Sequence, residues 1–504
     1  MTPRVPPSEP IRPSLEDFEA LARDATVVPV TRELLADALT PVLAWSTIGG
    51  APGSYLLESV EHGEKWGRYS FVGWRPHALV RGRRGRFEIE RDGVVEATDV
   101  GDPWPALRAY LAEWVPPSGG LDHLPRFWGG AVGYVAYDAV RTFEPTVGDR
   151  HADADAWDFS FAVGGTMLIF DDLRQRALLV SQARVGPGVD PREAYERARE
   201  ELAALADELS RMRVPRLLPP PRVGFDGALP PSSFDVEGYR AAVEVAKEHI
   251  RAGDIFQVVP SQRFTVDGRS VDLFDVYRML RAINPSPYMY LLSFPEVGIA
   301  GASPETLVRV EDGVAEVRPI AGTRKRGESA ADDDRIAEEL LADPKERAEH
   351  VMLVDLGRND LGRISKPGTV KITEEMAIER YSHVMHVVSN VRGELADGRD
   401  ALDVLRATFP AGTLTGAPKV RAMQIIEALE PVRRGVYGGA VGYVSFDGNL
   451  DVAIAIRTVV AQDGEIRVQA GGGVVEASDP QAEYEETVNK ARAALGAIEA
   501  ARRR

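Results

Sequence analysis

The sequence of 504 residues predicts an α+β fold, with a two-layered β-sandwich core of two related subdomains surrounded by helices. Two observations lead to this prediction. Strand-like runs dominate the chain as far as Val185, whereas helix-like and strand-like runs alternate after it. In addition, the segment WGGAVGYVAYD from Trp128 returns as YGGAVGYVSFD from Tyr437. Its paired glycines suit strands that approach closely, so the two halves are expected to form two related layers.

The N-terminal half is expected to consist mainly of strands. The runs that predict them are VVPV, YLLESV, FVGW, ALVRG and the two arms of RFEIERDGVVEA. Within the last run, Asp92-Gly93 is typical of a tight hairpin turn. A helix is expected from about Pro105 to Trp114, and Asp190-Pro191 should begin a long charged helix that ends near Met212.

A Pro-rich stretch, 214–233, is predicted to be a linker or a strap across the surface. It separates residues 1–213 from residues 234–504. The second region begins with helical apolar spacing from Gly238 to Ala252, and Gly253 should end that helix.

Composition and charge exclude several classes of protein. The formal net charge of −17 argues against a nucleic-acid partner, because the phosphate backbone would repel the chain. No run approaches the ~20 apolar residues that cross a membrane, and the N-terminus lacks a signal sequence, so we expect a cytoplasmic protein. Cysteine is absent, which excludes disulfides, thiolate metal sites and a cysteine nucleophile.

Two segments carry the same acidic pattern. They are DPKERAE, which contains Glu346 and Glu349, and DPQAEYEE, which contains Glu483 and Glu486. In each segment Asp can cap a helix and Pro suits the first helical position, so the glutamates share one helical face. Four carboxylates brought together would require a hard cation such as Mg²⁺. Taken singly, each segment is more typical of a solvent-exposed surface than of a metal site, because glutamates in a first turn are favoured by the helix dipole alone.

The first acidic segment continues as HVMLVDLGRNDLGRI. Its aliphatic residues are expected in the core: Val351, Leu353, Val354, Leu356 and Leu361. Its polar residues predict a buried polar network: Asp355, Arg358, Asn359 and Asp360.

Other polar residues lie in segments that core packing does not require. Glu305 comes just before a strand-like run, and Arg457 lies within one, where a buried guanidinium needs an anion. The backbone N–H groups of residues 471–473, a glycine triplet, could hold a carboxylate. His386 lies in an apolar segment, where a histidine is more often a satisfied core residue.

In order along the chain, SPETL, PIAGT, HVMLVDLGRNDLGRI, VMH, GAPK, GGAVGY, IAIRT, QAGGGVV and ExxETxNKA resemble the chorismate-utilising enzymes. The resemblance is closest to the large subunits of anthranilate synthases. It is dense in the C-terminal half and reaches the N-terminal half through LLESVEHGEKWGRYSFVGW. It implies a regulatory region with tryptophan-binding elements at 1–213 and a chorismate-binding catalytic domain at 234–504.

The resemblance also implies a reaction and roles for individual residues. The reaction is that of a Mg²⁺-dependent lyase in tryptophan biosynthesis, which converts chorismate and ammonia to anthranilate and pyruvate. Glu349 and Glu486 would hold the metal, with Glu346 and Glu483 beside them. Glu305 would be the general acid, and His386 would act in the elimination of pyruvate. The substrate would be bound by Gly322, Thr323, Tyr437, Arg457, Gly471, Gly472, Gly473 and Lys490.

Two positions distinguish this sequence from other members of the family. Relatives that use water carry an activating lysine where this chain has Gln257, and the 4-amino relative carries a nucleophilic lysine where it has Ala321. Both differences favour ammonia as the nucleophile. Because the chain has no cysteine, glutamine would be hydrolysed by a separate amidotransferase subunit. The alternatives are an aminodeoxychorismate or aminodeoxyisochorismate synthase and, in another class, a catalytically silent tryptophan sensor.

The resemblance further implies feedback inhibition by tryptophan at a site outside the chorismate cleft. Ser59 would bind the inhibitor through a hydrogen bond, and Pro287, Tyr288 and Met289 would line a slot for the indole ring. Without the resemblance, LLES predicts only a strand and NPSPYM only a turn. Inhibition would then be an allosteric coupling between two sites.

Overall fold

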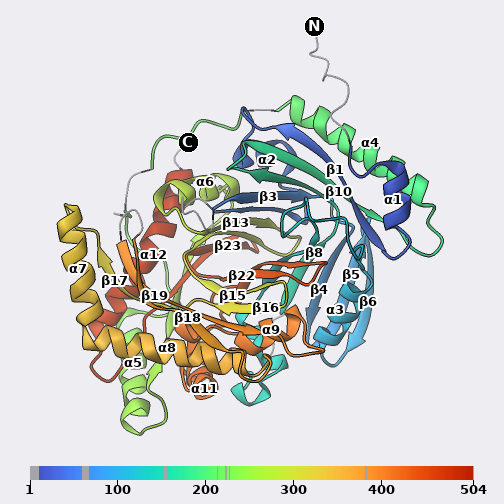
Figure 1. Ribbon diagram of the computed structural model, residues 1–504. Helices are drawn as coiled ribbons and strands as arrows, with labels where there is room; N and C mark the ends of the chain where they lie inside the picture. Colours follow the sequence, from blue (N-terminus) through green and yellow to red (C-terminus); the bar gives the residue numbers. More distant parts are fainter. Residues whose placement is uncertain are drawn as a thin grey trace.

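The computed structural model describes residues 11–59, 67–151, 156–212, 214–221, 224–225, 227–380 and 384–502. Within these ranges the chain forms two large antiparallel sheets that are packed against each other and flanked by helices (Figure 1). The predicted α+β sandwich is therefore confirmed.

The first sheet has ten strands in the described part of the chain. In spatial order they are β1 (Val27–Leu35), β10 (Arg176–Arg184), β9 (Thr166–Asp171), β3 (Tyr69–Trp74), β2 (Ser54–Glu58), β13 (Tyr288–Ser293), β14 (Gly298–Ser303), β23 (Thr458–Gln462), β24 (Glu465–Gly471) and β12 (Ser261–Asp267). Five strands from each half of the chain thus share one sheet, and they join where β2 pairs with β13.

The second sheet has twelve strands among the described residues. In spatial order they are β17 (Ile320–Lys325), β19 (Val384–Glu394), β16 (Val314–Val317), β15 (Thr306–Glu311), β22 (Leu450–Ile454), β21 (Ala440–Ser445), β7 (Gly130–Val135), β8 (Phe159–Val163), β4 (Ala78–Arg83), β5 (Gly85–Arg91) and β6 (Val94–Val100), with β18 (Lys371–Arg380) paired to β19. A separate short pair consists of β11 (Gln257–Val258) and β20 (Gly416–Ala417). The two halves of the chain meet again here, at β7 and β21.

The repeated GGAVGYV segments form this second junction. They are β7 and β21, which pair antiparallel with Gly133 opposite Gly442. A Cβ at Gly133 would lie 1.9 Å from the carbonyl oxygen of Ser160, so glycine permits the close approach that the sequence indicated. The repeated strands are neighbours in one sheet, so each half of the chain contributes part of both layers.

Helices cover the outer faces of both sheets (Figure 1). Their bounds are α1 (Leu15–Leu21), α2 (Pro41–Ile48), α3 (Pro103–Ala112), α4 (Pro191–Ser210), α5 (Val236–Arg251), α6 (Leu273–Ile283), α7 (Ala330–Ala342), α8 (Pro344–Gly362), α9 (Ala401–Thr408), α10 (Gly412–Thr415), α11 (Lys419–Leu429) and α12 (Pro480–Arg502). One apolar cluster joins α4, α6 and α12 to the ten-stranded sheet, and a second joins α3 and α9 to the other sheet. A third cluster, which includes Tyr55, Tyr290 and Tyr443, lies between the sheets.

Two local predictions have different outcomes. The predicted hairpin joins β5 to β6, and Asp92 and Gly93 both have the positive φ that a tight hairpin turn requires, at 49° and 77°. The polar network predicted in α8 is wrong, because Asp355, Arg358 and Asn359 are exposed. Only Asp360 is buried, and it pairs with Lys419 Nζ at 2.8 Å.

Candidate active site

The two acidic segments begin helices as predicted. Asp343 caps α8, where its Oδ1 accepts a hydrogen bond from the backbone N–H of Lys345 at 3.0 Å. Asp479 caps α12 in the same way, through the N–H of Ala482 at 2.9 Å. In both helices the cap is followed by proline at the first helical position, Pro344 in α8 and Pro480 in α12.

The carboxylates of the two helices interact across the gap between them. Burial raises the pKa of Glu349, and the negative charges of Glu346 and Glu486 raise it further. Burial also raises the pKa of Glu483, again with a contribution from Glu486. Charges from both helices therefore act on Glu349, but the four carboxylates do not meet at one point among the described residues.

Two of the four carboxylates have cationic partners. Glu346 pairs with Arg324 at 3.0 Å, and Glu486 pairs with Lys490 at 2.7 Å. Glu349 and Glu483 have no ion pair among the described residues, and Glu483 Oε2 is buried there without a hydrogen-bond partner. Among the described residues, no group of three or more carboxylate or imidazole side chains lies close enough together to hold a metal ion by itself. An open arrangement of this kind suits Mg²⁺, which usually retains waters and binds through one or two carboxylates together with the substrate.

Glu305 lies between β14 and β15, near the acidic helices. Burial raises the pKa of its carboxyl group to about 7, although a hydrogen bond from Thr413 and the charge of Lys490 both oppose the shift. Thr413 Oγ1 donates that bond to Glu305 Oε1 at 2.9 Å. Thr413 is not among the site residues predicted from the sequence. The only sequence feature that points to it is its position just before the GAPK motif.

His386 faces the turn of β17. Its Nδ1 lies 3.1 Å from the carbonyl oxygen of Gly322 and 3.0 Å from Thr323 Oγ1. Because a carbonyl can only accept, Nδ1 carries the proton in the neutral ring, which leaves Nε2 unprotonated. Burial lowers the pKa of His386, so the neutral form is favoured. Gly322 also touches α8, because a Cβ there would lie 3.1 Å from Glu346 Oε2.

Arg457 supplies a positive charge that no acid neutralises in the described part of the chain. Its φ of 52° lies in the left-handed region, which is uncommon for a residue with a side chain. Burial lowers its pKa, while the hydroxyl group of Tyr437 opposes the shift. The same guanidinium acts on the pKa of His386, which places these two residues near each other.

The glycine triplet fits between the other residues of the site. A Cβ at Gly471 would lie 2.9 Å from Tyr437 Oη, and one at Gly472 would lie 2.8 Å from Glu483 Oε2. One at Gly473 would lie 2.7 Å from Gln257 Nε2. Any side chain here would therefore collide with a neighbour. The structure thus brings the predicted substrate and metal residues together, with Gln257 beside them.

Lys490 connects these groups. Its Nζ donates to the carbonyl oxygen of Gly471 at 3.0 Å and pairs with Glu486. Its charge also lowers the pKa of Glu305 and of Glu349, so all of these groups lie within its electrostatic reach. The result is a site that is acidic on one side and cationic on the other.

The predicted inhibitor residues also come together, in a separate small cavity of about 60 Å³. Strands β2 and β13 bring Ser59 beside Pro287, Tyr288 and Met289, which all line this cavity. The Ser59 hydroxyl is buried without a hydrogen-bond partner among the described residues. The cavity is smaller than the ~300–1,000 Å³ of typical ligand pockets, so its walls must move to admit an amino acid.

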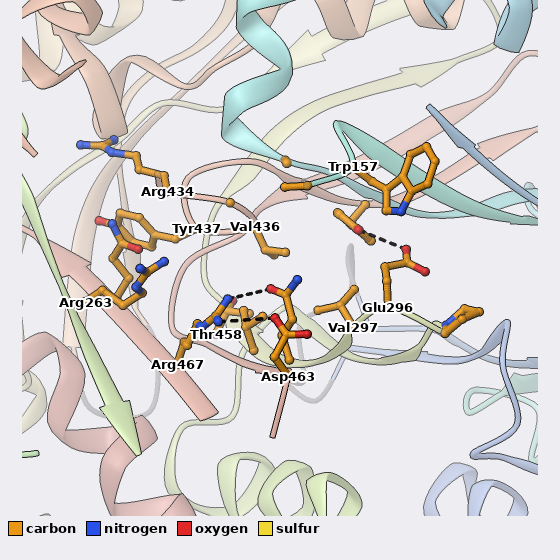
Figure 2. Close-up of a pocket in the computed structure, with 18 residues that line it drawn as sticks. Trp157, Arg263, Glu296, Val297, Arg434, Val436, Tyr437, Thr458, Asp463 and Arg467 are labelled. Atoms are coloured by element: carbon orange, nitrogen blue, oxygen red, sulfur yellow. Dashed lines mark hydrogen bonds and ion pairs between the residues drawn. The ribbon is translucent and has the colours of Figure 1, made fainter. Parts of the chain in front are cut away.

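Figure 2 shows a larger cavity, of about 330 Å³, that the sequence analysis did not identify. It lies between the sheets and is lined by Tyr134 of β7 and Val460 of β23. Tyr437 forms part of its wall, so the cavity lies next to the predicted substrate site.

The family described as chorismate binding enzyme matches residues 53–496, and the chain belongs to this family. It is 47% identical to anthranilate synthase component 1 of Aquifex aeolicus over 97% of this chain and 98% of that protein. It is 46% identical to anthranilate synthase component 1 of Mycobacterium tuberculosis over 97% of this chain and 96% of that protein.

Solved structures agree with these relationships. Anthranilate synthase component I of Streptococcus pneumoniae superposes with a TM-score of 0.73 at 36% identity, over 91% of this chain and 98% of that one. The isochorismate synthase MenF of Escherichia coli, at 19% identity and a TM-score of 0.67, shares the fold over 96% of this chain and 99% of that one. The predicted family and its α+β fold are confirmed. Within the described ranges, none of the helices is long and apolar enough to cross a membrane.

Proposed function

We propose that this protein is the chorismate-converting subunit of an anthranilate synthase, which forms anthranilate and pyruvate from chorismate and ammonia. One observation carries the choice of nucleophile. The amide of Gln257 lies against Gly473, at the position where relatives that use water carry a lysine. A neutral amide cannot activate water as a general base, and buried Ala321 cannot attack the ring. The names of the relatives support the same reaction.

The acidic helices are proposed to hold Mg²⁺ through Glu349 and Glu486, with Glu346 and Glu483 beside them. The unpaired charge of Glu349 and the unpartnered Oε2 of Glu483 fit a cation. When bound, Mg²⁺ would neutralise and orient the ring carboxylate of chorismate. Because Lys490 already pairs with Glu486, part of the acidic charge is balanced before any metal arrives.

The remaining residues supply proton transfer and anion binding. Glu305, with its pKa near 7, is half protonated at neutral pH and can donate a proton to the departing hydroxyl. The unprotonated Nε2 of His386 can accept a proton during the loss of pyruvate. Arg457 and Tyr437 would bind the enolpyruvyl carboxylate, together with the backbone of residues 471–473 and Lys490. Gly322 and Thr323 would contact the ring side.

The ammonia is proposed to come from a separate glutamine amidotransferase subunit. An amidotransferase of the cysteine type needs a thiolate, and this chain contains no cysteine. The designation of the relatives as component 1 supports a second component.

A direct assay tests the proposed function. Purified protein incubated with chorismate, Mg²⁺ and a high concentration of an ammonium salt should release anthranilate, detected by fluorescence, and an equal amount of pyruvate. Without an ammonium salt the rate should fall to background. A 4-amino product, or an amino intermediate without pyruvate, would identify one of the alternative synthases. Tryptophan binding without any turnover would instead identify a sensor.

Tryptophan is proposed to bind in the small cavity at Ser59. Hydrogen bonds of one residue that lines this cavity connect it to the active site. Tyr288 lines the cavity, and its hydroxyl bonds to Thr306 Oγ1 and to Asp451 Oδ1, each at 2.9 Å. Thr306 directly follows Glu305 in the chain, so movement of Tyr288 reaches the segment that holds the acid.

Ser59→Ala should weaken tryptophan inhibition by about 5- to 20-fold and leave the uninhibited rate within a factor of two, because one hydrogen bond to a charged ligand is lost. The measurement is the inhibition constant at fixed chorismate and ammonium. Ser54→Ala is the matched control, because Ser54 begins strand β2, which ends one residue before Ser59, and it has an equally unpartnered buried hydroxyl but does not line the cavity. Equal inhibition of both variants and the original protein would remove Ser59 from the inhibitor site.

A further inference from the structure

Tyr437 lines one wall of the larger cavity in Figure 2. Strands β12, β23 and β24 form one wall, and residues 434–437 form another. Tyr437 separates this cavity from the glycine triplet, because its hydroxyl lies against Gly471. Thr458, the neighbour of Arg457, also lines the cavity. The cavity therefore adjoins the place proposed for the enolpyruvyl carboxylate.

Arg263 gives this cavity a positive charge without a balancing acid. The guanidinium is half-buried, and its Nη1 donates to the backbone carbonyl of Arg433 at 3.2 Å. No carboxylate pairs with it among the described residues. Burial lowers the pKa of Arg263, and the charge of Arg467 lowers it further. The charges of Glu465, Asp138 and Glu430 oppose this shift. A partly buried guanidinium whose charge is disfavoured by burial and by a neighbouring guanidinium is stabilised by a bound anion.

The other charged residues of the cavity are largely satisfied. Arg434 is enclosed by Glu430 and two backbone carbonyls, so it serves the structure. Arg467 pairs with Glu465 at 3.0 Å on its exposed side. Glu296 accepts a hydrogen bond from Tyr134 and lies on the opposite side of the cavity from Arg263 (Figure 2). An anion at Arg263 therefore lies away from Glu296, whereas Asp463, which also lines the cavity, pairs with Arg467 at 3.7 Å.

We propose that the Arg263 side of this cavity binds a small carboxylate, and that the ligand is the three-carbon keto acid released from chorismate. The identity of this ligand rests on the proposed function. The volume of about 330 Å³ is at the low end for ligand pockets and admits a molecule of this size with room for water. A carboxylate released beside Arg457 would lie near Tyr437, which lines the same cavity as Arg263. An inorganic anion such as phosphate shares the same charge chemistry, and the test distinguishes the two.

Binding of ¹³C-labelled pyruvate to the full-length protein, measured by ligand-observed NMR without chorismate, tests the proposal. Arg263→Gln should weaken binding at least about tenfold, because a charge-assisted hydrogen bond is lost. Arg263→Lys keeps the charge and should bind within about fivefold of the original protein, which covers the case in which Arg263→Gln fails to fold. Arg269→Gln is the control, since Arg269 is highly exposed, pairs with Asp267 and lies outside the cavity.

The outcomes separate this site from the active site and from the proposed function. Arg457→Gln should leave the Arg263-dependent binding in place. Unchanged pyruvate binding in the Arg263→Gln variant would overturn the proposal, as would phosphate binding that displaces pyruvate at equal or lower concentration. A protein that makes anthranilate but shows no Arg263-dependent binding overturns only this inference. Arg263-dependent binding without anthranilate formation would overturn the assignment of the ligand as a reaction product.

Discussion

Glu305→Gln should lower kcat by about 100- to 10,000-fold, which is the range that a positioned general acid contributes. Glutamine keeps the shape of the side chain but has no proton to donate to the leaving hydroxyl. The rate of anthranilate formation at saturating chorismate, ammonium and Mg²⁺ provides the measurement. Thermal stability should be unchanged or higher, because the buried ionisable group is gone. A rate within tenfold of the original enzyme would show that another group supplies the proton.

The same carboxyl group should set the alkaline limb of the pH profile. Its pKa is raised to about 7, and an acid acts only in its protonated form, so kcat should fall as the pH rises through about 7. Thr413→Val removes a donor that favours the ionised form, so the pKa of Glu305 should rise and this limb should move to higher pH. If the alkaline limb stays at the same pH in this variant, the group that titrates is not Glu305.

Glu349→Gln should lower Mg²⁺-dependent turnover at least about 100-fold, because it removes a proposed ligand at the centre of the acidic helices. The same substitution should also raise the thermal stability of the metal-free protein. Since like charges and burial raise the pKa of Glu349, its ionised form destabilises the metal-free fold at neutral pH. The variant should therefore have a higher Tm than the original protein in EDTA and a smaller gain in Tm when Mg²⁺ is added.

Glu485→Gln is the matched control for this experiment. Glu485 lies in α12 next to the proposed ligand Glu486, but its side chain is exposed and bonds to Gln481. This variant should retain both the original rate and the original response to Mg²⁺. Normal turnover in Glu349→Gln, with the same rise of Tm on adding Mg²⁺, would exclude Glu349 as a ligand.

Features that depend on nearby residues could be predicted from the sequence. The Asp-Pro starts of α8 and α12 and the Asp92-Gly93 hairpin depend on hydrogen bonds or dihedral angles within a few residues. The buried polar network predicted in α8 is wrong. Asp355, Arg358 and Asn359 are spaced by three and four residues. That spacing places them on one face of a helix, and in this fold the face is exposed.

Features that depend on distant contacts could not be predicted. Thr413 reaches Glu305 across 108 residues of sequence, and no local pattern marks it as a partner. The family resemblance supplied the set of candidate residues, but it did not show that Lys490 pairs with Glu486. The pairing partner of each repeated strand was also beyond the sequence, since GGAVGYV indicates a strand without indicating its neighbour.

The two junctions between the halves have a consequence for how the chain folds. The inner edges of the N-terminal half, β2 and β7, pair with β13 and β21 of the C-terminal half. During synthesis these two edges emerge long before their partners, and an unpaired strand edge is a template for aggregation. Neither half can therefore complete its sheets alone. Almost the whole chain must be synthesised before all the strands are paired and the core is formed. The protein cannot be divided into separately folding parts at its Pro-rich stretch without exposing four strand edges.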